Sequence, residues 1–202
     1  MKPTFSTALT PRIRAGIAVG FAVVTLFGSQ VFAQMSNQGA GALQAFEMVR
    51  SVLQHPRCQN CHISGDAPLQ GDEGRPHGLY VVRGPKGHGA AAMECSVCHQ
   101  TQNLPSNYGN HLPPGAPNWH LPPPAIKMVF KDVSPRALCL TIKNPRETGG
   151  KNLSAMLEHM RDDKLVAWGW EPGEHRSIPS ITRAETVAAF KTWMEGGAPC
   201  PH

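Results

Sequence analysis

Two short segments of the chain carry cysteine and histidine at a spacing suited to one kind of chemistry. Residues 58–62 read Cys-Gln-Asn-Cys-His, and residues 95–99 read Cys-Ser-Val-Cys-His. Both have the form C-x-x-C-H, which is typical of the covalent attachment of a c-type haem. In such sites two thiols bond to the haem vinyl groups and the following histidine binds the iron. We therefore expect two haems, attached at Cys58 and Cys61 and at Cys95 and Cys98, with His62 and His99 as proximal iron ligands.

Paired C-x-x-C sequences also occur in zinc ribbons and in thioredoxin-like redox sites. A zinc ribbon needs four thiolates and has no use for a histidine directly after each second cysteine. The 33 residues between Cys61 and Cys95 also exceed the usual ribbon spacing of about 15–20 residues. The sequence therefore favours haem over zinc.

Each haem iron needs a second axial ligand if its coordination is to be closed. His77 lies between proline and glycine in the segment that joins the two motifs, where a rigid turn could present its ring. His159 lies on a predicted helix beside two methionines. We predict His77 and His159 as the distal ligands, with Met128 or His120, in or just after a proline-rich segment, as the replacement for either.

Two of the six cysteines, Cys139 and Cys200, lie outside the motifs. In an exported protein two such cysteines usually form a disulfide. This bond would close a loop of about sixty residues and stabilise the fold by about 3–4 kcal/mol in the chain-entropy model. The alternative is a pair of free buried thiols.

Residues 1–33 follow the plan of a secretory signal peptide. A basic segment reaches Arg14, an apolar run covers residues 15–28, and Val-Phe-Ala at 31–33 forms a small-residue cleavage site. The apolar run of 14 residues is shorter than the roughly 17–25 residues that span a bilayer, which disfavours an uncleaved anchor. We expect cleavage after Ala33 and a periplasmic location, because haems of this type are attached on the far side of the cytoplasmic membrane.

The chain has 202 residues, 41% of them hydrophobic and 16% charged, which suits a single domain over residues 34–202. Its charge of +5 would be compatible with nucleic-acid binding. However, three of the 19 basic residues lie in the leader, so 16 remain against 14 acidic residues. The sequence therefore gives no support for a nucleic-acid partner, and no later segment approaches membrane-spanning length.

The expected fold is mainly α: a small di-haem cytochrome c with long Gly/Pro-rich loops that wrap the haems. Apolar periodicity and capping residues predict helices over residues 36–54, 134–142, 152–161 and 182–195. Segments 65–89 and 104–124 are rich in glycine and proline and are expected to be loops. One apolar interruption, residues 79–82, is compatible with a short strand.

Four segments together resemble a family of exported di-haem cytochromes whose members are often labelled isoquinoline 1-oxidoreductase subunit. They are residues 55–62, the loop 71–84 with Pro76-His77-Gly78, residues 118–123 (Asn-Trp-His-Leu-Pro-Pro) and residues 197–201 (Gly-Ala-Pro-Cys-Pro). The resemblance covers nearly the whole mature chain. It implies a molybdenum-containing hydroxylase as redox partner, one that oxidises N-heterocycles or aldehydes while the haem subunit carries electrons away.

A haem with two strong axial ligands changes oxidation state without opening a coordination site, so it transfers electrons and leaves substrate chemistry to a partner. The sequence contains no G-x-S-x-G, P-loop or H-E-x-x-H motif. We therefore expect an electron carrier for a redox partner protein, not an enzyme by itself. The competing class is a di-haem enzyme with one open site, such as a peroxidase or a thiosulfate-oxidising cytochrome, and a gas sensor or scaffold is a weaker third.

Overall fold

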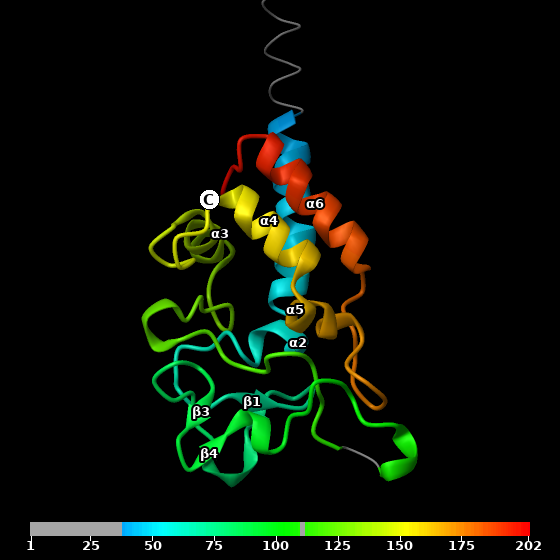
Figure 1. The fold of residues 1–202 in the computed structure, drawn as a ribbon. Coiled ribbons are helices and arrows are strands. Elements are labelled where there is room, and N and C mark those ends of the chain that lie inside the picture. The colour runs from blue at the N-terminus through cyan, green and yellow to red at the C-terminus, as the bar shows by residue number, and fades with distance from the viewer. Residues whose placement is uncertain (1–37, 110–111) are drawn as a thin grey trace, which may run out of the picture. The chain divides into compact units, whose positions relative to one another are not determined.

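The computed structural model of the chain describes residues 38–109 and 112–202. The predicted signal peptide, residues 1–33, lies outside the described residues. The described part is mainly α-helical, as predicted, and contains little sheet (Figure 1). Within these ranges, no helix combines the length and apolar character that crossing a membrane requires.

The elements follow one another as short helices joined by long loops. A helix over residues 38–53 is followed by α2 (Pro56–Gln59), α3 (Pro135–Lys143), α4 (Leu153–Asp162), α5 (Lys164–Ala167) and α6 (Arg183–Glu195). Single 3₁₀ turns are η1 (Gly78–Tyr80), η2 (Cys95–Val97), η3 (Ser106–Tyr108), η4 (Pro124–Ile126) and η5 (Trp168–Trp170). Two antiparallel hairpins pair β1 (Leu69–Gln70) with β2 (Arg75–Pro76), and β3 (Gly89–Ala90) with β4 (Met93–Glu94).

The longer helices begin where the sequence predicts. Ser134 caps α3 by accepting a hydrogen bond from the backbone N–H of Ala137 at 3.2 Å, and Asn152 caps α4 in the same way. Thr182 and Glu185 form the predicted capping box at the start of α6. Each cap satisfies backbone donors that the first helical turn leaves unpaired, which stabilises a helix by about 1 kcal/mol.

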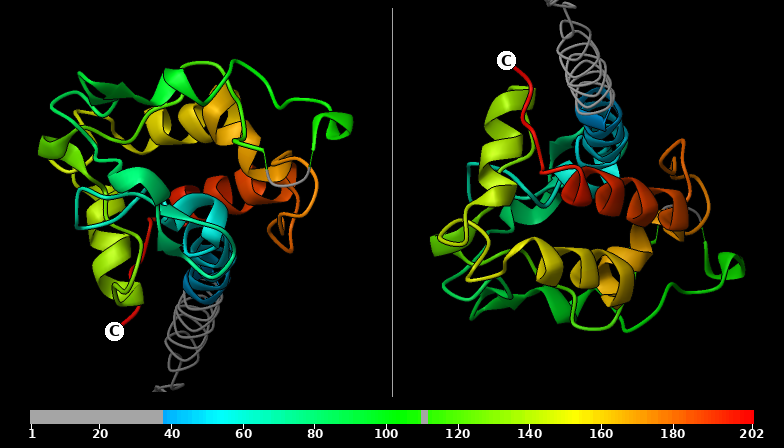
Figure 2. Two further views of the ribbon diagram at one scale, coloured as in Figure 1. Left: turned by 90° about the horizontal axis from the view of Figure 1, so that it is seen from below. Right: turned by 90° about the horizontal axis from the view of Figure 1, so that it is seen from above.

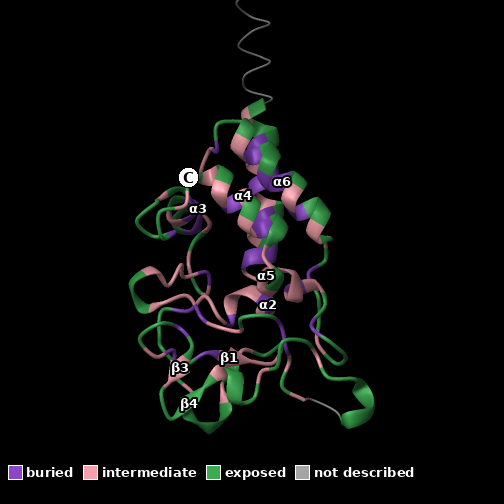
Figure 3. Ribbon diagram, in the orientation of Figure 1, coloured by how far each residue is buried: buried purple, intermediate pink, exposed green. Residues whose placement is uncertain are grey.

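The hydrophobic core is built by the helices. The first helix, α3, α4 and α6 each contribute one apolar face, and the ring centroids of Phe46 and Trp193 lie 5.2 Å apart. α4 and α6 pack against each other, which can be followed in Figure 2. Figure 3 shows that buried residues concentrate in these helices, while the segment around β1–β4 is mostly half-buried or exposed. The central side chains are Phe46, Val49, Leu138, Ile142, Met156, Met160, Phe190 and Trp193.

The predicted disulfide between Cys139 and Cys200 is confirmed, with the two Cα atoms 5.6 Å apart. Cys139 is fully buried in α3, so the bond fixes the C-terminal segment to the core. Trp193 reinforces this connection, because its indole N–H donates a hydrogen bond of 2.9 Å to the carbonyl of Pro199.

The possible strand at residues 79–82 is wrong. Residues 78–80 form the 3₁₀ turn η1, and Leu79 and Tyr80 have φ angles of 60° and 54°. An extended strand requires negative φ, so neither residue can belong to one. The sequence analysis also missed both hairpins, because two-residue strands are too short to show an alternating pattern.

The loops are held together by a buried arginine that the sequence analysis did not single out. The side chain of Arg83 is fully buried. Its guanidinium donates hydrogen bonds to the carbonyls of Ile63 at 3.2 Å, Gly65 at 3.0 Å and Pro122, and it pairs with Asp66 at 3.4 Å. Arg83 thereby ties the segment after the first motif to the proline-rich segment.

We predict that removing the disulfide lowers stability without unfolding the core. The variant Cys139→Ser/Cys200→Ser should lose about 3–4 kcal/mol in the free energy of unfolding, because the bond restrains a loop of 61 residues in the unfolded chain. Urea titration measures this loss. Equal stability of the variant and the native chain would contradict the prediction, and labelling of Cys139 and Cys200 in the unreduced, denatured protein would refute the bond.

Candidate functional site

The first motif is positioned by the junction between the helix over residues 38–53 and α2. Pro56 occupies the first position of α2, and His55 caps this helix by accepting a hydrogen bond from the N–H of Arg57 at 3.2 Å. Cys58 lies within α2. The backbone N–H groups of Cys61 and His62 both bond to the carbonyl of Cys58 at 3.2 Å, so the turn continues through the motif.

The second motif is positioned by the hairpin β3–β4. Gly84 has φ 68°, and a Cβ atom built on it would lie 1.9 Å from the carbonyl oxygen of Gly89, so this close approach requires glycine. Cys95 begins η2 and bonds through its N–H to the carbonyl of His88 at 2.9 Å. The N–H of His99 then bonds to the carbonyl of Cys95 at 2.9 Å.

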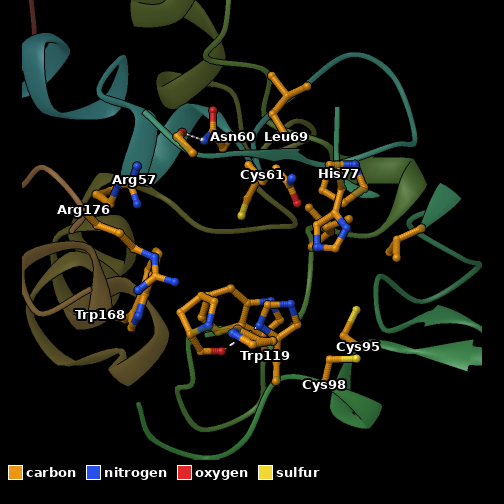
Figure 4. A pocket seen from close by; sticks show the side chains of 18 of the residues that line it. Arg57, Asn60, Cys61, Leu69, His77, Cys95, Cys98, Trp119, Trp168 and Arg176 are labelled. Carbon is orange, nitrogen blue, oxygen red and sulfur yellow. Dashed lines mark hydrogen bonds between the residues drawn. The ribbon is translucent and has the colours of Figure 1, made fainter. Parts of the chain in front are cut away.

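Each motif lines its own cavity. The Cys58 cavity, of about 210 Å³, is lined by Cys58, Cys61 and His62 and by apolar core residues such as Met156 and Phe190. The Cys95 cavity, of about 350 Å³, is lined by Cys95, Cys98, His99 and His77 (Figure 4). Small-molecule and cofactor sites commonly measure about 300–1,000 Å³, so the Cys95 cavity falls in this range and the Cys58 cavity below it.

The two cavities are neighbours that share one wall. Five residues line both of them: Arg57, Cys61, Trp119, His120 and Trp168. The rings of Trp119 and Trp168 meet edge to face, with centroids 4.8 Å apart. Because Cys61 belongs to this wall, the first C-x-x-C-H motif borders directly on the second cavity.

The ring of His62 is held by a hydrogen bond at Nδ1, which leaves Nε2 outside this hydrogen bond. Its Nδ1 lies 2.9 Å from the carbonyl oxygen of Met128, and because a carbonyl can only accept, Nδ1 must carry the proton and donate it. The ring of Phe130 stacks on that of His62 at a centroid distance of 4.0 Å. Burial lowers the pKa of His62 to about 4, so the imidazole is neutral at pH 7.

His99 repeats this arrangement in the second motif. Its Nδ1 donates a hydrogen bond of 2.7 Å to the carbonyl oxygen of Pro114. Trp119 stacks on the ring with centroids 4.3 Å apart and planes within 4°. Burial is also the main cause that lowers the pKa of His99.

These two hydrogen bonds fix the tautomer in which Nε2 has a free lone pair. A histidine that binds a metal through one nitrogen almost always donates its other N–H to a carbonyl, carboxylate or water. Both motif histidines therefore have the orientation and protonation state of metal ligands. The carbonyls of Met128 and Pro114 come from loops far along the chain, and no sequence pattern marks them.

The thiols of the first motif are buried. Burial raises the pKa of Cys58 to about 12 and of Cys61 to about 11, so both thiols carry their proton at pH 7. Among residues 38–109 and 112–202, no three His, Cys, Asp or Glu side chains are grouped so that they could hold one metal ion. A haem iron requires at most two protein ligands, because the porphyrin supplies the other four nitrogens.

The structure brings His77 to the second site. His77 lies at the start of η1, and its Nδ1 donates to the carbonyl of Gly78 at 2.8 Å. Its ring centroid lies 6.1 Å from that of His99. Two imidazoles bound to opposite sides of one metal ion have centroids about 6 Å apart, since a metal–nitrogen bond is about 2 Å long. The two ring planes are inclined by 61°, and the spacing is compatible with His77 and His99 holding one iron together.

The structure brings His159 to the first site. His159 lines the Cys58 cavity from α4, together with Met156 and Met160. Its Nδ1 lies 3.3 Å from Oδ2 of Asp163, one turn further along the chain. The carboxylate orients the ring with Nδ1 engaged, which is the arrangement common in carboxylate–histidine–metal sites.

The two replacement candidates also reach the cavities. Met128 lines the Cys58 cavity, and its carbonyl accepts the hydrogen bond from Nδ1 of His62. His120 lines both cavities. Its Nδ1 donates a hydrogen bond of 2.6 Å to the carbonyl of Asn118, and its ring packs against His88 with centroids 5.2 Å apart. Both residues therefore stay in the set of candidate ligands as replacements.

Comparison of the chain with protein-family models, with curated proteins and with solved structures finds no match. The resemblance to exported di-haem cytochromes therefore stays a prediction that rests on the quoted motifs.

The geometry adds residues that the sequence analysis missed, namely Arg57, Trp168 and Arg176 in the cavity walls. Of these three residues, only Arg57 could have been noticed in the sequence, because it directly precedes Cys58 of the first motif.

We predict that Asp163 stabilises the protein in a pH-dependent way. The hydrogen bond with His159 is the largest cause that lowers the pKa of Asp163 to about 2, against an ordinary value of 3.8. The stabilisation is complete above pH 3.8 and is lost as the pH falls towards 2, because the unfolded chain takes up the proton first. Allowing for solvent screening of this half-buried carboxylate, Asp163→Asn should lower the free energy of unfolding at pH 7 by about 1–2 kcal/mol.

Urea unfolding at a series of pH values between 7 and 2 measures this effect. The neighbouring variant Asp162→Asn is the matched control, because Asp162 is exposed and its ion pair joins it only to the adjacent Arg161. The control should show a much smaller loss at pH 7. A loss in Asp163→Asn that persists undiminished at pH 2 would refute the proposed charge effect.

Proposed function

We propose that the protein is an exported di-haem cytochrome c that transfers electrons in the periplasm. Cys58 and Cys61 would hold one haem, and Cys95 and Cys98 the other, with His62 and His99 on the proximal side of the two irons. One observation carries this proposal. In both C-x-x-C-H motifs the histidine donates Nδ1–H to a loop carbonyl, at 2.9 Å and 2.7 Å, and so keeps Nε2 available.

The surroundings of the motifs fit this cofactor. The Cys58 cavity is walled mainly by apolar side chains of the helical core, which suits the faces of a porphyrin. Trp119 and Trp168 supply aromatic surface to both cavities. When bound, each haem supplies a one-electron ferric/ferrous couple. The shared wall supports a carrier with two redox groups close to each other.

The candidate distal residues favour a carrier over an enzyme. The ring centroid of His77 lies 6.1 Å from that of His99 in the second site. His159 lines the first cavity, and its Nδ1 contacts the carboxylate of Asp163. Two histidines per iron would leave no coordination position for peroxide or another substrate. Such closed sites exchange electrons without binding substrate.

The partner that we propose is a redox protein, and a molybdenum-containing hydroxylase is the class that the family resemblance implies. This part of the proposal rests on the motifs quoted above. The described surface near the second motif is compatible with contact to a protein, since the side chains of Leu79, Tyr80 and Val97 are 71%, 98% and 69% exposed.

We predict that the purified protein contains two covalent haems. The alkaline pyridine spectrum should report two c-type haems per chain, because each motif provides two thiols. Cys95→Ser/Cys98→Ser should retain one haem. Cys139→Ser/Cys200→Ser, which removes the same number of cysteines, should retain two. One haem or bound zinc in the native protein would overturn the proposal.

We predict that His77 and His159 each close one iron site. The native protein should bind neither carbon monoxide nor cyanide rapidly. His77→Ala and His159→Ala should each convert one of two low-spin EPR signals and allow carbon monoxide to bind one haem, because each variant opens one position. His88→Ala is the matched control and should leave both signals intact. A variant with two unchanged low-spin signals would remove that histidine from the ligand set.

A further inference from the structure

A cluster of two arginines and one aspartate lies in the wall of the Cys95 cavity and has no role assigned to it so far. Arg57, Asp72 and Arg176 all line this cavity. The carboxylate of Asp72 pairs with the guanidinium of Arg57 and accepts a hydrogen bond of 3.0 Å from the N–H of Ser177. Two positive charges thus share one negative charge, so the cluster has a net charge of +1.

The charge of Arg176 is left largely uncompensated. Its guanidinium donates to the carbonyls of Pro172, at 3.0 Å, and Leu112, and it forms no ion pair with any described residue. Burial lowers the pKa of Arg176, the nearby charge of Arg57 lowers it further, and Asp72 opposes both. An anion placed between the two guanidinium groups would relieve this repulsion.

Arg57 adds an unsatisfied donor to the same wall. Its side chain is 3% exposed, and its Nε has no hydrogen-bond partner within the described residues. A buried donor without a partner costs about 1–3 kcal/mol, so an acceptor bound in the cavity beside this atom would be stabilised. The guanidinium also lies 5.9 Å from the ring centroid of Trp168, which fixes its orientation.

The cluster lies at the end of the cavity opposite the attachment cysteines. Figure 4 shows Cys95 and Cys98 on one side of the cavity and Arg57, Trp168 and Arg176 on the other, with Trp119 between them. A haem bonded through its vinyl groups has its two propionates at the opposite edge of the ring. Attachment at Cys95 and Cys98 therefore directs these carboxylates towards the arginines.

We propose that Arg176 and Arg57 form an anion site that binds a propionate of the haem attached at Cys95 and Cys98. The inference rests on the proposed function, because it requires that haem. Guanidinium groups bind carboxylates with paired N–H donors in a fixed geometry. A positive charge held beside the haem favours its reduced, more negative state, so the site raises the reduction potential of this haem relative to a chain without it.

The test is a redox titration of the holoprotein with charge-altering variants. Arg176→Gln should retain two haems and lower the reduction potential of one of them, whereas Arg176→Lys, which keeps the charge, should restore most of the native value. Arg146→Gln is the matched control, because Arg146 is exposed and lines neither cavity. It should leave both potentials unchanged. Arg57→Gln provides a second variant if Arg176→Gln fails to fold.

Single-haem backgrounds assign the effect to one site. In Cys58→Ser/Cys61→Ser, which keeps the haem at Cys95 and Cys98, Arg176→Gln should still lower the potential. In Cys95→Ser/Cys98→Ser it should have no effect. Two attached haems with both potentials unchanged, or equal shifts in Arg176→Gln and Arg146→Gln, would overturn the anion site alone. A native protein without covalent haem would instead overturn the proposed function.

Discussion

The arrangement of the loops depends on one buried charge, the guanidinium of Arg83. Burying an unpaired charge is costly, so the group must find a partner for each donor. It does so with the carbonyls of Ile63, Gly65 and Pro122 and with Asp66. These partners come from segments that have almost no regular secondary structure to hold them. Arg83 therefore joins these segments through its side chain, whereas helices and sheets are held by backbone hydrogen bonds. Both cavities are bounded by loops that Arg83 joins.

The motif histidines rely on the same loops. The carbonyl that accepts from His62 belongs to Met128, just after the proline-rich segment, and the one that accepts from His99 belongs to Pro114 within it. Proline suits such a segment, because it fixes the backbone and leaves its carbonyl free to accept. Aromatic stacking by Phe130 and Trp119 restrains the two rings further. Each motif histidine is thus oriented by a hydrogen bond and an aromatic contact.

The two cavities differ in their surroundings. The Cys58 cavity borders the helical core, with Ile142, Met156 and Phe190 in its wall. The Cys95 cavity is formed mostly by loops and includes the charged cluster of Arg57, Asp72 and Arg176. Burial and nearby charge both tune the reduction potential of a haem. The fold thus gives the two C-x-x-C-H motifs unequal environments, and under the proposed function the two haems would differ in reduction potential.

The local features of this protein could be predicted from its amino-acid sequence. The caps at Ser134, Asn152 and Thr182 predicted where helices begin, and the leftover cysteines predicted the disulfide, because both depend on residues that act through short-range or covalent chemistry. The motifs identified six of the candidate site residues for the same reason. The folded chain was needed to show that His77 lies next to His99, that His159 reaches the first cavity, and that Arg57 and Arg176 line the same cavity. These contacts join segments far apart in the chain, so no local pattern could encode them. The left-handed conformation of Leu79 and Tyr80, which overturned the possible strand, likewise reflects the tertiary context, because their apolar types alone favour extended backbone.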